Sequence, residues 1–230
     1  MTRGLAARRL PPHLAAGALL FAACAGPEGQ AATTRTTAAT GEMAHSVSAE
    51  TPTQNPGAMP AITLDGAITP DEWKADLARI AGDAWITSND AYRSETEPAV
   101  AYATAMRLQP GGLSATGCLW SIHADETTAI QWRFFQAWDP VRQTGMLYQS
   151  SAGGMVGFGH FQQVEGEPEL VQDFSGPGGT AFRAGHFETW DGDDTRISRS
   201  VNRDGDVWAP RREYTWHRDP DATIPCDEWR

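Results

Sequence analysis

Histidines and carboxylates are the side chains in this sequence that could carry acid–base or metal chemistry. His123, His160, His186 and His217 fall on or at the ends of segments with alternating hydropathy. No two of them stand at a spacing that gives a metal two ligands on one face with a third donor nearby. A haem would need an axial histidine in an apolar pocket. His160 or His217 could serve, but ordinary strand histidines explain the pattern better, so the cofactor stays unassigned.

One pair has the spacing of an acid–base couple. His186 and Glu188, at i and i+2, share one face of a strand-like segment, and Asp173 on the preceding segment could join them. An enzyme of unknown reaction could use these residues. A hydrogen-bonded strand pair on the solvent face explains the same pattern more simply, and we expect that arrangement.

Other site patterns are missing or incomplete. No glycine-rich phosphate loop follows a strand and opens a helix, and no Gly-x-Ser-x-Gly elbow is present. Asp191, Asp193 and Asp194 lack the remaining ligands of a calcium loop, so we predict no metal site. Arginines gathered over 183–212 could favour a carboxylate ligand, or could simply pair with acids on exposed strands.

The first 23 residues have the pattern of a signal peptide. Three arginines lie within the first nine residues, an apolar run follows over 14–23, and small residues surround Cys24. The apolar run is too short to span a bilayer. Residues 20–24 (LFAAC) resemble the bacterial lipobox, except that Phe21 takes the position of the usual leucine.

This resemblance implies that Cys24 is lipidated and becomes the mature N-terminus. The lipid chains would then anchor the protein on an envelope leaflet, with its domain facing the periplasm. Ordinary cleavage after the small residues 23–25 would instead release a soluble periplasmic protein. Residues 24–60 are rich in Ala, Thr and Pro without apolar periodicity, so we expect a disordered tether. The folded domain then covers 61–230.

Composition and cysteine content limit the partners and the compartment. With 40% apolar residues the chain can bury a real core, and a net charge of −11 repels phosphate backbones, which argues against nucleic acid as a partner. Processing leaves Cys118 and Cys226, and in an oxidising compartment we expect them to form a disulfide. Alternatively, Cys118 is a buried small hydrophobe and Cys226 is free on the tail.

A helix followed by many strands is the predicted architecture. Thr69-Pro70-Asp71-Glu72 is a capping box with proline at the first helical position. Apolar residues then recur at helical spacing up to Gly82, a C-terminal cap. Beyond it the period changes to two, with turn residues about every ten positions. The predicted strands cover 84–92, 99–108, 113–123, 128–138, 145–150, 155–163, 169–174, 181–190, 195–202 and 207–217.

Short links between these strands require antiparallel neighbours. The expected fold is mainly β, an antiparallel up-and-down barrel of about 8–10 strands with one short N-terminal helix, because closure removes exposed edges. A curved half-barrel with the helix across its open side is the alternative.

Alternation indicates which residues could line the interior of the barrel. Ile130, Trp132, Phe134, Gln136 and Trp138 share one face of their strand. An aromatic ligand cavity would be built from part of this face and two residues of the sixth strand. The predicted ligand-binding residues are Trp132, Phe134, Gln136, Trp138, Phe158 and His160. A filled core, in which alanine and glycine oppose bulky aromatics, explains the pattern better.

Several turns and strand ends resemble a known family. The run from Trp138-Asp139-Pro140 to Gly157, and the closing strand over 211–218, are similar to bacterial calycin-like barrels, in which a YDP…G turn, a serine and glycine stretch and an E-x-T-R-like strand recur. The resemblance covers about 85–218. By analogy with lipocalins and haem-binding nitrobindins it implies a barrel that binds a small, mostly apolar molecule. An envelope protein without a ligand, whose surface binds partners, is the other alternative.

Overall fold

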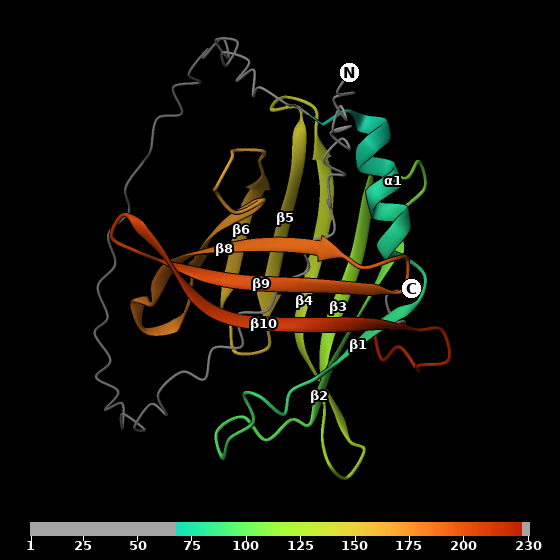
Figure 1. Cartoon of the computed structure of the whole chain (residues 1–230), viewed down its shortest axis with the longest axis vertical. Coiled ribbons are helices and arrows are strands. Elements are labelled where there is room, and N and C mark those ends of the chain that lie inside the picture. The colour runs from blue at the N-terminus through green and yellow to red at the C-terminus, as the bar shows by residue number, and fades with distance from the viewer. Residues whose placement is uncertain (1–67, 227–230) are drawn as a thin grey trace, which may run out of the picture.

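Ten antiparallel strands form a closed barrel, and one α-helix lies at one end of it (Figure 1). The computed structural model describes residues 68–226; the predicted signal peptide, the predicted lipidation site at Cys24 and the predicted tether over 24–60 lie outside the described residues. The strands are β1 (Ala84–Ser88), β2 (Ala101–Leu108), β3 (Ser114–Ile122), β4 (Thr128–Asp139), β5 (Thr144–Ser151), β6 (Val156–Phe161), β7 (Leu170–Ser175), β8 (Ala181–Trp190), β9 (Thr195–Asp204) and β10 (Val207–Asp219).

The sheet closes because its first strand pairs with its last. Each strand from β1 to β10 pairs antiparallel with the next, and β1 also pairs with β10 through Ala84 and Asp219. A short 3-10 helix, η1 (Pro177–Gly179), lies between β7 and β8. The predicted antiparallel up-and-down barrel with one short helix is confirmed. Closure leaves no strand edge open within the barrel.

The helix α1 (Pro70–Ile80) begins at the predicted capping box. Glu72 N donates to Thr69 Oγ1 at 3.2 Å, and Thr69 N donates to Glu72 Oε2 at 2.7 Å. Its buried residues Trp73, Leu77 and Ile80 pack onto the barrel. Each bond of the box satisfies a backbone N–H that the first helical turn leaves without a partner.

The helix extends across one end of the barrel. Trp73 Nε1 donates to the carbonyl of Leu113 at 3.1 Å, and its ring meets Phe161 edge-on at 5.1 Å. At the other end of the helix, Arg79 lies 3.8 Å over the Trp190 ring and donates to Gly192 O at 2.6 Å. These contacts join α1 to strands on both sides of the barrel, so the helix covers this end.

The first strand is shorter than predicted. β1 ends at Ser88 rather than at Tyr92, and 89–100 form a connection that folds back against the barrel. Asn89 Nδ2 donates to Ala99 O at 3.1 Å, so a side chain bonds where a strand partner would. Pro98 has no backbone N–H to give to a ladder, which keeps the pairing from starting earlier in β2.

The C-terminal tail covers part of the outer face of the barrel. Cys118 on β3 forms a disulfide with Cys226, 108 residues later. Ala103, Ala105 and Trp120 are buried on the same outer face as Cys118. The small side chains of β2 therefore let another segment approach closely.

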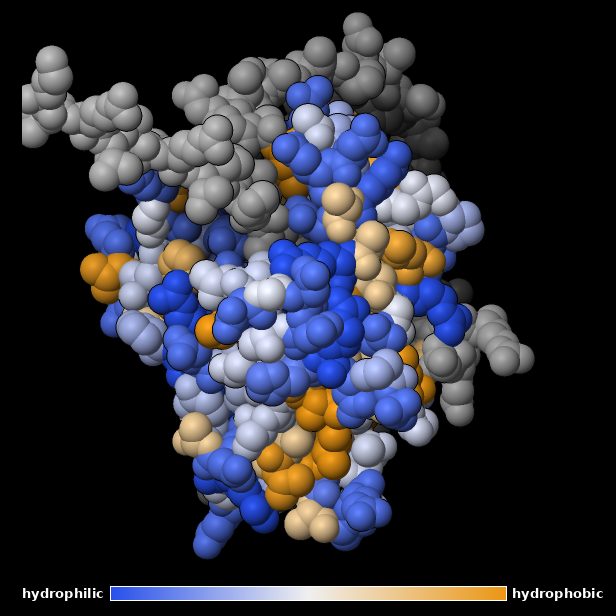
Figure 2. Space-filling view, turned by 45° about the vertical axis from the view of Figure 1, so that its right-hand side comes forward, coloured by the Kyte–Doolittle hydropathy of each residue, from blue (hydrophilic) through white to orange (hydrophobic). Residues whose placement is uncertain are grey.

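Elsewhere the visible surface is largely polar. Figure 2 shows hydrophilic residues over most of one view, with hydrophobic residues gathered mainly on its lower half. Over 68–226, no helix has the length and apolar character needed to cross a membrane.

Candidate functional site

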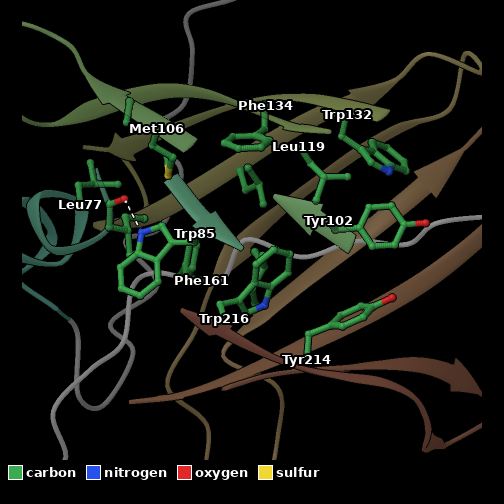
Figure 3. Close-up of a cluster of buried hydrophobic side chains, with 14 of the residues drawn as sticks. Leu77, Trp85, Tyr102, Met106, Leu119, Trp132, Phe134, Phe161, Tyr214 and Trp216 are labelled. Atoms are coloured by element: carbon green, nitrogen blue, oxygen red, sulfur yellow. Dashed lines mark hydrogen bonds between the residues drawn. The ribbon is translucent and has the colours of Figure 1, made fainter. Parts of the chain in front are cut away.

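The predicted wall on β4 lies inside the barrel. Trp132, Phe134 and Gln136 are all almost fully buried, and Trp138 packs against the same cluster while partly exposed. Figure 3 shows Trp132 and Phe134 in the cluster of buried side chains that also holds Tyr102 and Leu119. Their predicted ligand-binding role stays a prediction.

One member of the predicted β4 face lies elsewhere. Ile130 packs with the outer cluster around Trp120. Leu119 pairs with Trp132 but Trp120 pairs with Ile130, so Gln131 is an extra residue on β4 and the alternation of inner and outer positions breaks there. A bulge of this kind reverses which face a residue points to.

The predicted interior positions of Phe158 and His160 on β6 are wrong. Phe158 is 44% exposed, and His160 Nε2 lies 3.5 Å from Asp139 Oδ2. The neighbouring glycines take the inner positions. A Cβ on Gly159 would lie 1.9 Å from the carbonyl oxygen of Val171, so no side chain fits there. Alternation then places Phe158 and His160 on the outer face.

Amide side chains occur along one row of cross-strand partners inside the barrel. The row follows consecutive strand pairs from β4 to β9 and comprises Gln136, Leu147, Gly159, Gln172, Ala184 and Asn202. We call these six residues the amide row. Gln136 and Gln172 are fully buried, whereas Asn202 is partly exposed.

Several polar atoms of the amide row have no hydrogen-bond partner among residues 68–226. These are both amide atoms of Gln136, Nε2 of Gln172 and Oδ1 of Asn202. Gln172 Oε1 accepts from Gln149 Nε2 at 3.2 Å, so only its amino group is left over. Buried polar atoms without partners are rare in native proteins, and here they occur together.

His186 adds a second unfilled group beside the row. It lies between Leu170 and Ser200 on the neighbouring strands and is fully buried. Neither ring nitrogen has a partner among the described residues. Burial, helped by the positive charge of Arg211, lowers the pKa of His186 to about 3, so the ring is neutral at physiological pH.

The expectation that His186 and Glu188 form a solvent-face pair is therefore wrong. Both side chains lie inside the barrel, whereas Asp173 lies outside and binds Arg183 through two hydrogen bonds of 2.7 and 2.9 Å. The three residues do not come together as one acid–base group.

Glu188 belongs to a buried ion pair near the helix-covered end. Arg196 Nη1 donates to Glu188 Oε1 at 3.2 Å, and both side chains are fully buried. The guanidinium lies 5.0 Å over the Trp85 ring and 5.4 Å over the Trp216 ring. Burial raises the pKa of Glu188 to about 8, although the charge of Arg196 acts in the opposite direction.

A second ion pair holds the connection 89–100 against β10. Arg212 binds both carboxylate oxygens of Glu97, and Tyr102 donates to Glu97 Oε1 at 2.9 Å. Burial raises the pKa of Glu97, but the hydrogen bonds from Arg212 and Tyr102 outweigh it and hold this pKa below its usual value. Tyr214 donates to Asn89 Oδ1 at 3.0 Å, which ties the network to the barrel.

The interior therefore combines buried ion pairs with uncharged polar groups that lack partners among the described residues. Sequence reasoning named Gln136 but missed Gln172, Asn202 and the inward direction of His186. The available signal was the shared strand face of His186 and Glu188, which we assigned to solvent because both are polar. Within 68–226, no group of three or more metal-binding side chains comes together. His217, the other histidine considered for haem, is exposed and lies 3.3 Å from Thr195 Oγ1 through its Nδ1.

No protein-family model matches the chain, and no curated protein matches it significantly. The closed antiparallel barrel is consistent with the calycin-like fold that the sequence resembles.

Proposed function

We propose that this protein binds a small, mostly apolar molecule inside its barrel, beside His186 and the amide row. The observation that carries the proposal is His186, a fully buried ring with both nitrogens unpartnered among the described residues. Leaving a buried donor or acceptor unfilled costs about 1–3 kcal/mol. A bound molecule that fills these groups removes that cost, and the neighbouring aromatic residues supply apolar contact.

The proposed binding function accounts for more of the interior than catalysis does. An enzyme would use shifted pKa values at groups free to exchange a proton. Glu188 has such a pKa, but its carboxyl group accepts a hydrogen bond from Arg196, whose guanidinium lies over two tryptophan rings. That contact gives the carboxyl a structural partner. We therefore infer that this is a binding protein. The feature that we infer it shares with lipocalins and nitrobindins is a barrel that holds a ligand.

Native mass spectrometry of the full chain, beside its denatured mass and visible absorption, tests this function. We expect extra mass that leaves on denaturation; a Soret band would identify haem. His186→Phe, which removes both nitrogens, should lose the extra mass. His217→Phe is the matched control, because His217 is exposed, and it should keep the extra mass. A bare wild-type mass, together with ordered waters bonded to His186 and Gln136 in a crystal structure, would overturn the proposal.

We also propose that the chain is exported and anchored through Cys24. The disulfide between Cys118 and Cys226 supports export, since such bonds persist in oxidising compartments. The mature protein should carry lipid mass on Cys24 and sediment with membranes, and Cys24→Ser should lose both. A mature N-terminus after residue 25 without lipid would replace the anchor with a soluble periplasmic form. An unprocessed N-terminus would contradict export itself.

A further inference from the structure

The uncharged groups inside the barrel also indicate the chemistry of the ligand, and this inference rests on the proposed function. We propose that the ligand is a planar, uncharged molecule that presents an adjacent donor and acceptor, as a lactam or a primary amide does, to Gln136 and Gln172.

The charge of the interior favours an uncharged ligand. Glu188 contacts Arg196 and Glu97 contacts Arg212, so the ionisable groups of both buried pairs already have partners. An ionised ligand would bring a charge that neither pair can neutralise. Burying an unpaired charge costs far more than burying a neutral polar group that gains its hydrogen bonds.

The hydrogen-bonding groups require both a donor and an acceptor. Nε2 and Oε1 of Gln136 both lack partners among the described residues, so turning the amide by 180° leaves the same requirement. The amino group of Gln172 adds donors. A glutamine amide pairs in two places with an edge that carries a donor beside an acceptor, as it does with adenine. A lactam or primary amide has such an edge.

Aromatic rings beside the two glutamines favour a flat ligand. Phe134 precedes Gln136 by two positions on the same inner face, and Phe174 follows Gln172 by two positions on β7. The Phe174 ring stacks on Phe182 with centroids 4.8 Å apart and an interplanar angle of 6°. Aromatic side chains next to a polar edge can contact a planar ring in an offset-stacked or edge-to-face arrangement.

Three bicyclic probes test this ligand class by calorimetry on the full chain, refolded from denaturant to remove any bound molecule. Isoquinolin-1(2H)-one carries the lactam edge, its N-methyl derivative lacks the donor, and 1-naphthoate carries a negative charge. We expect the lactam to bind at least about tenfold more tightly than either other probe, because each analogue leaves a buried group unfilled.

Substitutions at two glutamines locate the effect. Gln136→Met keeps the length of the side chain but removes its hydrogen bonds, so the preference for the lactam over its N-methyl derivative should fall toward one. Gln143→Met changes an exposed turn residue, and this variant should behave as the wild type does. If Gln136→Met does not fold, the ratio between the probes on the wild-type protein still decides the question.

Failure of the ligand class and failure of the binding function give different results. Equal or tighter binding of the N-methyl derivative or of 1-naphthoate overturns the lactam class and leaves interior binding intact. If the molecule released in native mass spectrometry carries a carboxylate or phosphate, the lactam class is likewise overturned and interior binding is left intact. Absence of binding by all three probes, with a bare native mass, overturns both proposals.

Discussion

Breaking the bond between Cys118 and Cys226 should destabilise the barrel by about 2–4 kcal/mol. The disulfide joins residues 108 apart. Closing a loop of about 100 residues in the unfolded chain is worth about 4.7 kcal/mol at 25 °C in the chain-entropy model. Residues 222–226 beyond β10 pack along the outer face of the barrel, so cutting the bond also frees this segment in the folded state. That freedom offsets part of the loss.

Cys226→Ser is the substitution of choice for this prediction. It leaves Cys118 as a buried thiol, which packs as a small hydrophobe. In urea unfolding the variant should show a lower midpoint and a somewhat steeper slope than the wild type, because the unfolded chain without the bond is less compact and exposes more surface. Reductant should lower the wild-type midpoint to that of the variant.

A loss below about 1 kcal/mol would refute the reasoning, because it would mean that the bond does not restrict the unfolded chain as the loop length requires. A reductant effect on Cys226→Ser of the same size as on the wild type would also refute it. In that case the reductant would act through something other than this bond.

Two further predictions concern one strand and one ion pair. Gly159→Ala should destabilise the barrel by about 1–3 kcal/mol or more, because the added Cβ would lie 1.9 Å from Val171 O. Phe158→Ser, on the outer face, should change the free energy of unfolding by less than about 0.5 kcal/mol. Urea midpoints of the two variants compare these effects, and equal losses of stability would contradict the inner and outer assignment. The lowered pKa of Glu97 means that its contribution to stability is present above the unfolded pKa near 4.5 and is lost as pH falls through the folded value. Unfolding free energies between pH 6 and 3 should therefore fall more steeply for the wild type than for Glu97→Gln, which cannot ionise against Arg212, and parallel curves would contradict this.

Local signals predicted the elements of this barrel well. The capping box at Thr69 and Glu72 specified where α1 begins, because its two bonds involve only neighbouring residues. Turn residues between period-two segments located ten strands, and short links required antiparallel pairing. Closure was the expected outcome because it covers strand edges, with a curved half-barrel as the alternative, and the pairing of β1 with β10 decides between them. The start of the helix, the turns and the antiparallel links depend on contacts that are close in sequence, so the sequence alone contains them.

The direction of each strand face was decided by the tertiary structure. A period of two shows which residues share a face but not which face points inward. On β6 the inner positions belong to glycines because Val171 leaves no room for a side chain, and on β4 a register shift moves Ile130 outward. His186 was expected in solvent because it is polar. It is buried because strands far apart in sequence enclose it, and only their closure into one barrel places it beside the amide row.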